Sequence, residues 1–404
     1  MLFQKYTIFA PNFNNKLAFV EGSGYRIINS KTSKEKRVLI VGPVPPPFGG
    51  IATVIDSIIN SDLSKEYVFD IFNRSESIYD SQTSPFRRKL LKAKRVWQLF
   101  RKLWSGRYDF LHIHGSTSGF LGDTMVMVVA FLASSRVLLH LHGTDWEKFY
   151  GSVSRFRRIY VRLGLAIPKR IVVLYDLWAQ NIRKIDPKIN VRVIRNFVPD
   201  CPKPQQVSLD SLREKLGIRQ EEFLISSIGR VGWRKGSFDI VQAVKQLLVD
   251  NSNFKVLLVG GEELQGEMNN IKKAVDDNGL GYTIKLIGEI KISDVPLYLG
   301  ISDVFVLPSY YEGMPMSIIE AMRAGKPIIS TTVGAIPDMI ESGVSGILVN
   351  PGQPEEIASA VTKLRNDPIL RKKISKGARN AFEQGFETSK VVLDINNLYK
   401  EMIE

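Results

Sequence analysis

Short apolar runs that alternate with helical segments constrain the fold of this chain more than any other feature of its sequence. The first run, RVLIVG, leads through a loop into a helix that begins near Ile51, and the alternation continues along the chain. Strands of a parallel sheet covered on both faces have this pattern, because both of their sides are buried. We therefore predict an α/β fold. The expected strands are residues 37–42, 68–72, 110–114, 137–142, 171–174, 191–194, 223–228, 255–259, 284–287, 304–307, 327–330 and 346–349.

A proline-rich stretch separates these strands into two series. Residues 197–206 (FVPDCPKPQQ) hold three prolines and show no periodicity, so we interpret them as linker. The 404 residues also exceed one ordinary core. We predict two doubly wound Rossmann-like domains that face each other across a cleft, with a helical tail. The expected parts are a polar extension at residues 1–36 that could form a hairpin, a first domain at 37–197, a linker at 198–215, a second domain at 216–380, and a helix at 381–404 that crosses back to the first domain.

The positive charge of the chain is concentrated in its first half. Residues 1–200 hold 31 Lys and Arg against 15 Asp and Glu, a net of +16, whereas the rest hold 24 against 26, a net of −2. An anionic partner would therefore meet the first half. No apolar run approaches the roughly 18–20 residues that span a bilayer, and no secretory signal is apparent. The single cysteine, Cys201, excludes a disulfide framework and fits a cytosolic protein.

The loop after the first strand of the second series combines glycines with cations. Residues 228–236 (IGRVGWRKG) hold three glycines together with Arg230, Arg234 and Lys235. Glycines let the backbone approach a phosphate, and the cations can neutralise it. An ordinary turn between strand and helix, with solvated charges, would have the same composition.

A second loop ends another strand of that series and starts a helix. Residues 307–320 (LPSYYEGMPMSIIE) hold Glu312 in the loop, and the free N–H groups of the helix start favour an anion. Glu320 lies within an apolar stretch of the helix, where a buried carboxylate needs a partner such as the diol of a ribose. In the alternative interpretation Glu320 faces solvent or pairs with Arg323 or Lys326.

Two further loops complete the expected site. Residues 332–338 (TVGAIPD) follow a strand and form a candidate wall. Residues 287–290 (IGEI) have exposed backbone at a strand end, which could bond the edge of a nucleobase.

Residues 227–351 resemble the donor domain of retaining glycosyltransferases with the GT-B fold, namely glycosyltransferase family four, also called glycosyl transferases group one. The resemblance rests on G-R-x-x-x-x-K-G at residues 229–236 and E-G-x-P-x-x-x-x-E at 312–320. It also rests on A-x-x-x-G-x-P at 321–327 and GILV-x-P at 346–351, and the four motifs occur in the family's order.

The resemblance implies a hexosyltransferase of the EC 2.4 type that takes a UDP- or GDP-sugar, with no metal and no cofactor. Arg230 and Lys235 would hold the diphosphate, Glu312 and the amides after it the sugar, and Glu320 the ribose. Two cations and a helix N-terminus would replace a metal at the leaving diphosphate. The predicted catalytic residues are Glu312, His142, Arg230 and Lys235. The predicted donor-binding residues are Gly49, Gly50, Gly229, Arg230, Lys235, Ile290, Glu312, Gly313, Met314, Pro315, Met316 and Glu320.

The loop at residues 43–50 (PVPPPFGG) resembles the glycine-containing N-terminal loop of the family, which lies near the diphosphate and the acceptor. A stiff connection from strand to helix is an equally good interpretation of its three consecutive prolines.

All four histidines fall into two pairs, His112 with His114 and His140 with His142. Residues two apart on a strand share a face, so two such pairs on neighbouring strands could supply metal ligands. The resemblance instead implies that His142, in LHGTD, lies near the donor sugar. We therefore take His112 and His140 as structural and predict no metal site. The predicted acceptor-side residues are His114, Gly115 and Asp145.

Residues 86–104 (FRRKLLKAKRVWQLFRKLW) hold eight basic residues and no acidic one, with apolar residues at helical spacing. A basic amphipathic helix with aromatic residues is typical of a membrane interface. A second basic run, residues 155–162, lies in the same half. In the alternative, the apolar stripe packs on the sheet. The predicted membrane contacts are Arg87, Arg88, Lys89, Lys92, Lys94, Arg95, Trp97, Arg101, Lys102 and Trp104.

These patterns together favour a cytoplasmic enzyme that associates peripherally with the inner face of the plasma membrane. Its expected partners are a nucleotide-sugar, an anionic membrane surface and a lipid-linked saccharide acceptor of bacterial surface polysaccharide or lipopolysaccharide synthesis. A soluble or protein acceptor is the alternative within the same fold. A basic nucleic-acid-binding protein is the alternative from another class, but no motif that reads RNA or DNA is recognisable.

Overall fold

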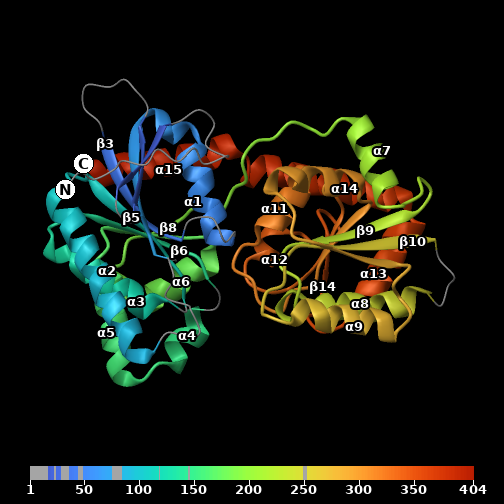
Figure 1. The fold of residues 1–404 in the computed structure, drawn as a ribbon, viewed down its shortest axis with the longest axis horizontal. Helices are drawn as coiled ribbons and strands as arrows, with labels where there is room; N and C mark the ends of the chain where they lie inside the picture. The colour runs from blue at the N-terminus through green and yellow to red at the C-terminus, as the bar shows by residue number, and fades with distance from the viewer. Residues whose placement is uncertain are drawn as a thin grey trace. The chain divides into compact units, whose positions relative to one another are not determined.

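The computed structural model describes residues 17–21, 24–28, 36–43, 49–74, 84–117, 119–143, 146–248 and 253–404. The chain divides into two compact units, which we describe separately (Figure 1). Unit 1 consists of Met1–Pro199 and Ser389–Glu404, and unit 2 of Asp200–Thr388.

Unit 1 is built on an eight-stranded sheet in the order β1-β2-β4-β3-β5-β6-β7-β8. The strands from β4 to β8 in this order are parallel, whereas β1 and β2 form an antiparallel hairpin that adds to β4. The hairpin lies in the extension that we predicted from its weak pattern. The strands are β1 Leu17–Glu21, β2 Gly24–Ile28, β3 Lys36–Gly42, β4 Tyr67–Asn73, β5 Phe110–Gly115, β6 Val137–Leu141, β7 Arg170–Val173 and β8 Val191–Val193.

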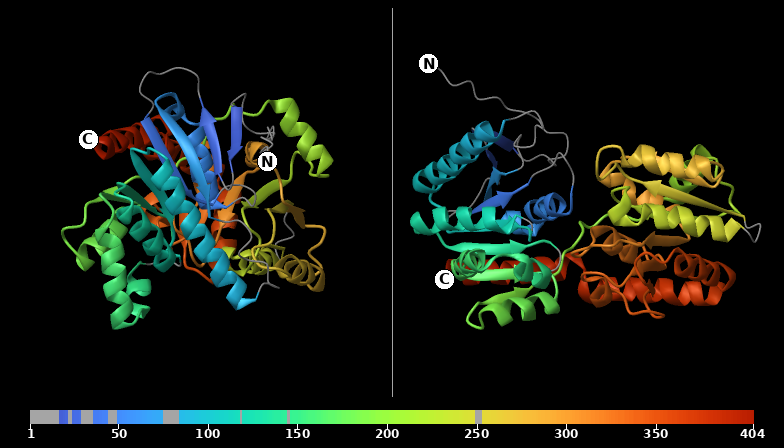
Figure 2. Two further views of the ribbon diagram at one scale, coloured as in Figure 1. Left: turned by 60° about the vertical axis from the view of Figure 1, so that its left-hand side comes forward. Right: turned by 90° about the horizontal axis from the view of Figure 1, so that it is seen from below.

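The central strands of unit 1 are buried on both sides, which is why they are continuous apolar runs rather than alternating ones. Helices α2, α3 and α5 pack side by side, whereas α15 lies against the sheet (Figures 1 and 2). The helices of unit 1 are α1 Gly50–Asn60, α2 Pro85–Ser105, α3 Phe120–Leu132, α4 Trp146–Ser152, α5 Arg155–Ala166, α6 Asp176–Ile185 and α15 Thr388–Ile403.

The last helix of the chain, α15, completes the core of unit 1. Its Tyr399 is fully buried and packs edge-on against Phe110, with ring centroids 4.9 Å apart. Arg136, just before β6, donates to the carbonyl oxygen of Met402 at 2.7 Å and so holds the end of the helix.

Unit 2 contains a six-stranded, fully parallel sheet in the order β11-β10-β9-β12-β13-β14. Both units are therefore doubly wound α/β folds, as we predicted. Helices α8, α9 and α13 lie on one face of this sheet, and α11 and α14 on the other (Figure 1). The strands are β9 Phe223–Ile228, β10 Phe254–Val259, β11 Ile284–Gly288, β12 Val304–Leu307, β13 Ile328–Thr331 and β14 Ile347–Val349. The helices are α7 Gln206–Lys215, α8 Ser237–Leu247, α9 Glu267–Asp277, α10 Val295–Ile301, α11 Met316–Arg323, α12 Ile336–Met339, α13 Pro354–Asn366 and α14 Pro368–Gly385.

Two segments differ from the sequence-based expectation. Most of the stretch that we predicted as linker, 198–215, is helix α7, which packs on α10. The helical tail is two helices, because α14 ends at Gly385, a poor helix former, and buried Phe386 leaves the helical conformation. Within the described residues, no helix combines the length and the hydropathy required to cross a bilayer.

Candidate active site

The order of strands in unit 2 places a binding site at the carboxyl ends of β9 and β12. The chain winds outward from β9 in one direction and returns to pair β12 on its other side, so these two strands flank the switch point. In open α/β sheets, ligands bind beyond the carboxyl ends of the strands at this point. The loops that follow β9 and β12 are the two that hold the glycines and charges identified in the sequence.

Close backbone contacts fix these loops relative to one another. Gly236 adopts a left-handed conformation, with φ of 72°, and a Cβ atom there would lie 2.1 Å from the carbonyl oxygen of Pro308. The amide of Tyr310 also donates to the carbonyl of Arg234 at 2.8 Å. Only glycine allows this approach, so the last glycine of the first loop has a structural role.

The loop after β13 closes on the same site and corresponds to the wall that we predicted at 332–338. Gly334 has φ of 58°, and a Cβ atom there would lie 2.0 Å from the carbonyl oxygen of Glu312. The amide of Ala335 donates to the carbonyl of Gly313 at 2.8 Å. The backbone on both sides of the Glu312 side chain is therefore held in place.

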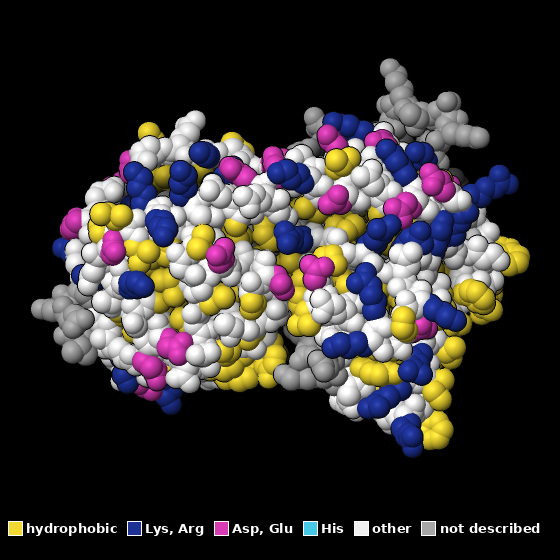
Figure 3. Space-filling view, turned by 180° about the vertical axis from the view of Figure 1, so that it is seen from behind, with side chains coloured by type: hydrophobic (Ala, Val, Ile, Leu, Met, Phe, Trp, Pro, Cys, Tyr) yellow, Lys and Arg dark blue, Asp and Glu magenta, His cyan; other side chains and the backbone are white. Residues whose placement is uncertain are grey.

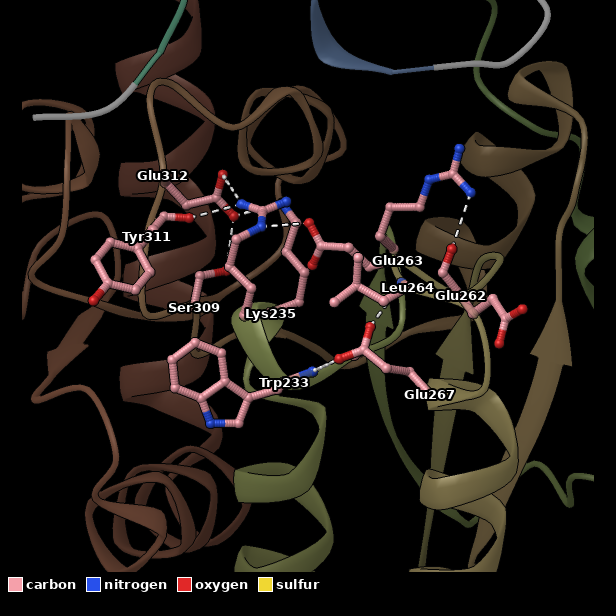
Figure 4. Close-up of polar contacts among 12 residues, drawn as sticks. Trp233, Lys235, Glu262, Glu263, Leu264, Glu267, Ser309, Tyr311 and Glu312 are labelled. Atoms are coloured by element: carbon pink, nitrogen blue, oxygen red, sulfur yellow. Dashed lines mark hydrogen bonds and ion pairs between the residues drawn. The ribbon is translucent and has the colours of Figure 1, made fainter. Parts of the chain in front are cut away.

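Glu312 is one of the residues whose polar contacts are drawn in Figure 4. Its side chain is 7% exposed, and its Oε1 accepts from Lys235 Nζ at 2.5 Å and from Ser309 Oγ at 2.7 Å. Arg234 Nη1 lies 3.9 Å from Oε2. The structure thus joins Lys235 to Glu312, two residues predicted as catalytic, and adds Ser309 and Arg234.

Arg234 is one of the three cations that we expected to neutralise a phosphate, but it is not among the predicted catalytic or donor-binding residues. Its guanidinium donates to the carbonyl of Tyr311 at 2.9 Å and forms an ion pair with Glu263 (Figure 4). A short 3-10 turn, Trp233–Lys235, presents Arg234 and Lys235 as neighbours. The run of two consecutive cations before a glycine was the available signal, but the sequence does not reveal which of them faces Glu312.

Arg230 points toward a different neighbour from Lys235. Its Nη1 donates to the carbonyl of Glu262 at 3.2 Å, in the loop after β10. Gly229, before it, donates its amide to the carbonyl of Val259 at 2.9 Å, and its own carbonyl lies against Gly260. The two predicted diphosphate-binding cations therefore share one loop but contact two others, Arg230 the loop after β10 and Lys235 the loop after β12.

The second predicted carboxylate of the donor site is Glu320 in α11. Burial raises the pKa of Glu320 to about 7, and the charge of Arg323 partly offsets this effect. Lys326 donates to the carbonyls of Gly300 and Ser302, at 3.0 and 2.7 Å. The ammonium group of Lys326 therefore donates mainly to backbone carbonyls, which argues against the alternative in which Glu320 pairs with Lys326.

The remaining donor-side predictions lie close to these residues in the chain. Met314 and Pro315 are buried, and Pro315 is the N-cap of α11, which begins at Met316. Ile290 follows β11 by two residues and is partly buried. The amide groups of the first turn of α11 start directly after the loop that carries Glu312, as an anion site requires.

In unit 1 the switch point lies between β3 and β5, since β3 pairs with β4 on one side and β5 on the other. Gly49 and Gly50 open helix α1 and are exposed, with open space where a Cβ atom would lie. Residues 44–48 of the proline-containing loop, and the acceptor-side prediction Asp145, lie outside the described residues.

The four histidines form one buried cluster in unit 1. His114 Nδ1 and His142 Nε2 are 2.9 Å apart, and the rings of His140 and His142 stack with centroids 4.1 Å apart. Burial lowers the pKa of His112 and His142 to about 3, and the pKa of the other two falls well below the usual range for the same reason. The rings are thus neutral at physiological pH. His142 follows β6, and its amide donates to the carbonyl of Gly115 at 2.7 Å.

An ion pair that the sequence analysis missed lies beside the end of β5. Arg74, which follows β4, pairs with Asp123 of α3, which is 2% exposed. Burial raises the pKa of Asp123 although Arg74 opposes the shift. A Cβ atom on Gly115 would lie 2.3 Å from Asp123 Oδ2, so a larger residue at this predicted acceptor-side position would displace the carboxylate.

Helix α2 exposes the apolar stripe that we identified in residues 86–104. Trp97 is 59% and Trp104 77% exposed, whereas Leu99 and Leu103 are the side chains that pack into the unit. The alternative in which the stripe packs on the sheet is therefore wrong. Helix α3 adjoins both α2 and α5. Helices α3 and α5 expose further large apolar side chains, namely Met125, Val128, Phe131, Leu132, Phe156, Ile159 and Leu163.

Cations surround this apolar surface. Figure 3 shows Lys and Arg side chains interleaved with hydrophobic ones at the lower right of the view, over unit 1. Of the predicted contacts, Arg87, Lys94 and Arg101 are exposed and Lys102 is partly exposed. Arg95 instead donates to the carbonyl of Arg74 at 2.9 Å. The side chains of Arg88, Lys89 and Lys92 are not among those that the structure describes.

Comparisons with known proteins agree with this geometry. Residues 209–381 match the family described as glycosyl transferases group 1, and residues 75–196 match the glycosyl transferase 4-like domain. A curated relative from Escherichia coli, UDP-Gal:alpha-D-GlcNAc-diphosphoundecaprenol alpha-1,3-galactosyltransferase, is 29% identical over 77% of this chain and 80% of its own.

Two solved structures share the fold over nearly their whole length. Anabaena HepE in complex with UDP has a TM-score of 0.70 at 18% identity, with 90% of this chain and 100% of that one covered. WaaG, a glycosyltransferase involved in lipopolysaccharide biosynthesis, has a TM-score of 0.67 at 15% identity, with coverage of 90% and 99%. The family matches, the relative and the shared GT-B fold lead to one conclusion: the chain belongs to the group 1 glycosyl transferases, glycosyltransferase family four, and is a glycosyltransferase.

Proposed function

We propose that the chain transfers a hexose, with retention and without a metal, from a UDP-sugar to a hydroxyl of a lipid-linked saccharide in bacterial surface polysaccharide synthesis. The proposed binding of the nucleotide-sugar rests on one observation. Lys235, Arg234 and Ser309 surround the buried carboxylate of Glu312 at the switch point of unit 2. The proposed lipid-linked acceptor rests on the exposed basic and apolar surface of α2, α3 and α5.

The cations of the site suit a leaving diphosphate. In the transfer, the bond between the anomeric carbon and a diphosphate oxygen breaks, and negative charge develops on the leaving group. Lys235 and Arg234, with the amides at the start of α11, are fixed donors that stabilise this charge as it forms. The acceptor oxygen then bonds to the anomeric carbon, and its proton passes to the leaving diphosphate oxygen.

Glu312 and Ser309 have a second task in this proposal. The carboxylate of Glu312 holds Lys235 in place before the donor arrives, so that little reorganisation is needed on binding. Once the diphosphate binds Lys235, the carboxylate of Glu312 can accept a hydrogen bond from a hydroxyl of the donor sugar. Glu320, four residues into α11, is the proposed ligand of the ribose diol.

The choice of UDP rests on the Escherichia coli relative, whose name gives UDP-galactose as its donor and a diphosphoundecaprenol-linked sugar as its acceptor. A polyprenyl-linked acceptor is confined to a membrane. A basic helix with exposed tryptophans is the kind of surface that places an enzyme there, because aromatic side chains enter the interface and cations attract anionic headgroups. This agreement favours the lipid-linked acceptor over a soluble one.

The donor proposal is tested by thermal unfolding of the full chain in EDTA with UDP, GDP, ADP and their sugars. We expect UDP compounds to raise the Tm, and Glu320→Gln to remove most of that rise. Glu341→Gln, which changes an exposed carboxylate of the same unit, is the matched control. Stabilisation by GDP or ADP but not UDP would refute the nucleotide assignment, and dependence on an added metal would refute metal independence.

The acceptor proposal is tested by sedimentation with vesicles of phosphatidylglycerol or phosphatidylcholine, and by transfer to polyprenyl-diphosphate sugars or to the same sugars without lipid. We expect salt-sensitive binding to anionic vesicles only. The double variant Trp97→Ser, Phe156→Ser should weaken it, and Ile369→Ser, an exposed apolar residue of unit 2, should not. If the chain does not bind vesicles and transfers to lipid-free sugars as fast as to polyprenyl-diphosphate sugars, a soluble acceptor is favoured.

A further inference from the structure

The histidines of this chain occur nowhere except in one buried cluster. The sequence has four histidines, and all four lie on β5, β6 and the residue after β6. The parallel register pairs His114 with His140, so the side chains of the two strands meet on one face of the sheet. Tyr399 of α15 closes this face, since its hydroxyl lies 2.7 Å from His112 Nδ1. All four histidines belong to unit 1.

Three of the rings leave one nitrogen free in the part of the chain that the structure describes. The Nε2 atoms of His112, His114 and His140 are buried and have no hydrogen-bond partner there. A buried polar atom without a partner has lost its hydrogen bonds to water without replacement, so three in one place need an explanation. The same three residues each offer a ring nitrogen within 4.8 Å of the others.

We propose that His112, His114 and His140 bind a divalent transition-metal ion of the zinc class through their Nε2 atoms. Ligand nitrogens about 2.0–2.1 Å from a tetrahedral zinc lie roughly 3.3 Å from one another. The three residues offer ring nitrogens within 4.8 Å of one another, and the rings would close to that spacing when the metal binds. This inference departs from our prediction of no metal site, in which His112 and His140 were structural.

The other ring nitrogens have the partners that metal-bound histidines use. A histidine bound through Nε2 carries its proton on Nδ1 and donates it to an oxygen or nitrogen nearby. His112 Nδ1 has the hydroxyl of Tyr399 at 2.7 Å, and His114 Nδ1 has the Nε2 of His142 at 2.9 Å. One tautomer therefore satisfies both contacts and leaves both Nε2 lone pairs for the metal.

The donor set selects the class of metal. The ligands are neutral imidazoles, with no carboxylate among them, which suits Zn²⁺, Ni²⁺, Co²⁺ or Cu²⁺ and not Mg²⁺ or Ca²⁺. The site would connect β5 to β6 and, through Tyr399, to α15. It would also fix His142 as an acceptor at Nε2, with its proton on Nδ1, because His114 Nδ1 would donate to that atom.

The test uses the full chain with a histidine-free affinity tag, because a histidine tag would bind metal itself. The protein is labelled with ¹⁵N only in histidine, so its spectrum contains four imidazoles. After dialysis against a chelator, Zn²⁺ is added. We expect a single equivalent to bind and to shift the Nε2 signals of three rings, while Co²⁺ gives the visible absorption of a tetrahedral site. Unchanged histidine spectra with excess Zn²⁺ would overturn the proposal, whatever any variant does.

Variants locate the site. His140→Gln should weaken Zn²⁺ binding at least tenfold, and Tyr399→Phe, which removes the partner of His112, should weaken it about 10–100-fold. Cys201→Ser, which changes the exposed thiol, should leave it unchanged. Binding that is lost with Cys201→Ser and kept with His140→Gln would refute the histidine site. Circular dichroism in EDTA establishes that each variant is folded before its affinity is compared.

Discussion

Replacement of Glu320 by glutamine should stabilise the protein in neutral and alkaline solution while it weakens nucleotide binding. Burial raises the pKa of Glu320 from 4.5 to about 7, so the folded chain favours the neutral acid. Below pH 4.5 the carboxyl is protonated in both the folded and the unfolded chain and has no effect. As the pH rises from 4.5 to 7, the carboxyl loses its proton first in the unfolded chain, so the free energy of unfolding falls. Above pH 7 the free energy of unfolding does not fall further on account of this group.

The size of the effect follows from the pKa. A shift of 2.5 units at 1.36 kcal/mol per unit sets a ceiling of about 3 kcal/mol. Because Glu320 is partly exposed and water screens its charge, we expect roughly 1–3 kcal/mol. Glutamine has the shape of the neutral acid and does not ionise. For a domain of this size, each 1 kcal/mol corresponds to about 2–4 °C in Tm.

The assay is thermal and urea unfolding of wild type, Glu320→Gln and the control Glu341→Gln between pH 5.5 and 8.5. We expect the Glu320→Gln advantage to grow with pH to about 7 and then level off, and the control to match wild type. UDP affinity of the wild type should rise over the same range, because the ribose hydroxyls donate to the ionised carboxylate. A pH-independent difference would refute the buried-carboxylate argument, and equal UDP affinity in the variant would refute the ribose assignment.

Three further substitutions test other parts of the structure. Gly236→Ala should lower stability by about 1–3 kcal/mol and raise the KM for the nucleotide-sugar, because its methyl group meets the carbonyl of Pro308; thermal unfolding and steady-state kinetics measure both. Tyr399→Phe should cost about 1–2 kcal/mol in urea unfolding, because His112 loses its buried partner. Arg213→Met should cost about 2–4 kcal/mol in the same assay, since three or more backbone carbonyls lose a buried donor; a loss under 0.5 kcal/mol would contradict the role of its hydrogen bonds.

The elements of the fold were accessible from the sequence because they depend on local patterns. The expected strands at 223–228 and 304–307 have the bounds of β9 and β12, since both are apolar runs bounded by polar residues. Helix α7 was missed because its stretch follows a run of prolines and its apolar face is short. It becomes a helix by packing on α10, where Leu209 lies against Gly300, a contact that no local pattern reveals.

The site was accessible only in part, for a related reason. Glu312 and Lys235 stand out because each occurs in a motif with glycines at fixed distances. The contribution of Ser309 and Arg234 depends on how two loops 70 or more residues apart pack together, as the Arg234 to Tyr311 contact does. The convergence of the histidines likewise depends on the register of β5 and β6, which a single sequence does not fix.

The position of α15 has a consequence for the order in which the chain acquires its structure during synthesis. The sheet of unit 1 is complete when residue 193 has been made, but the face that contains the histidines awaits Tyr399, about two hundred residues later. Domains fold as units during translation, so the first unit leaves the ribosome with a hydrophobic face uncovered while the second is being made. The chain can bury that face only after α15 has been made, so the first unit completes its fold after the second unit has been synthesised.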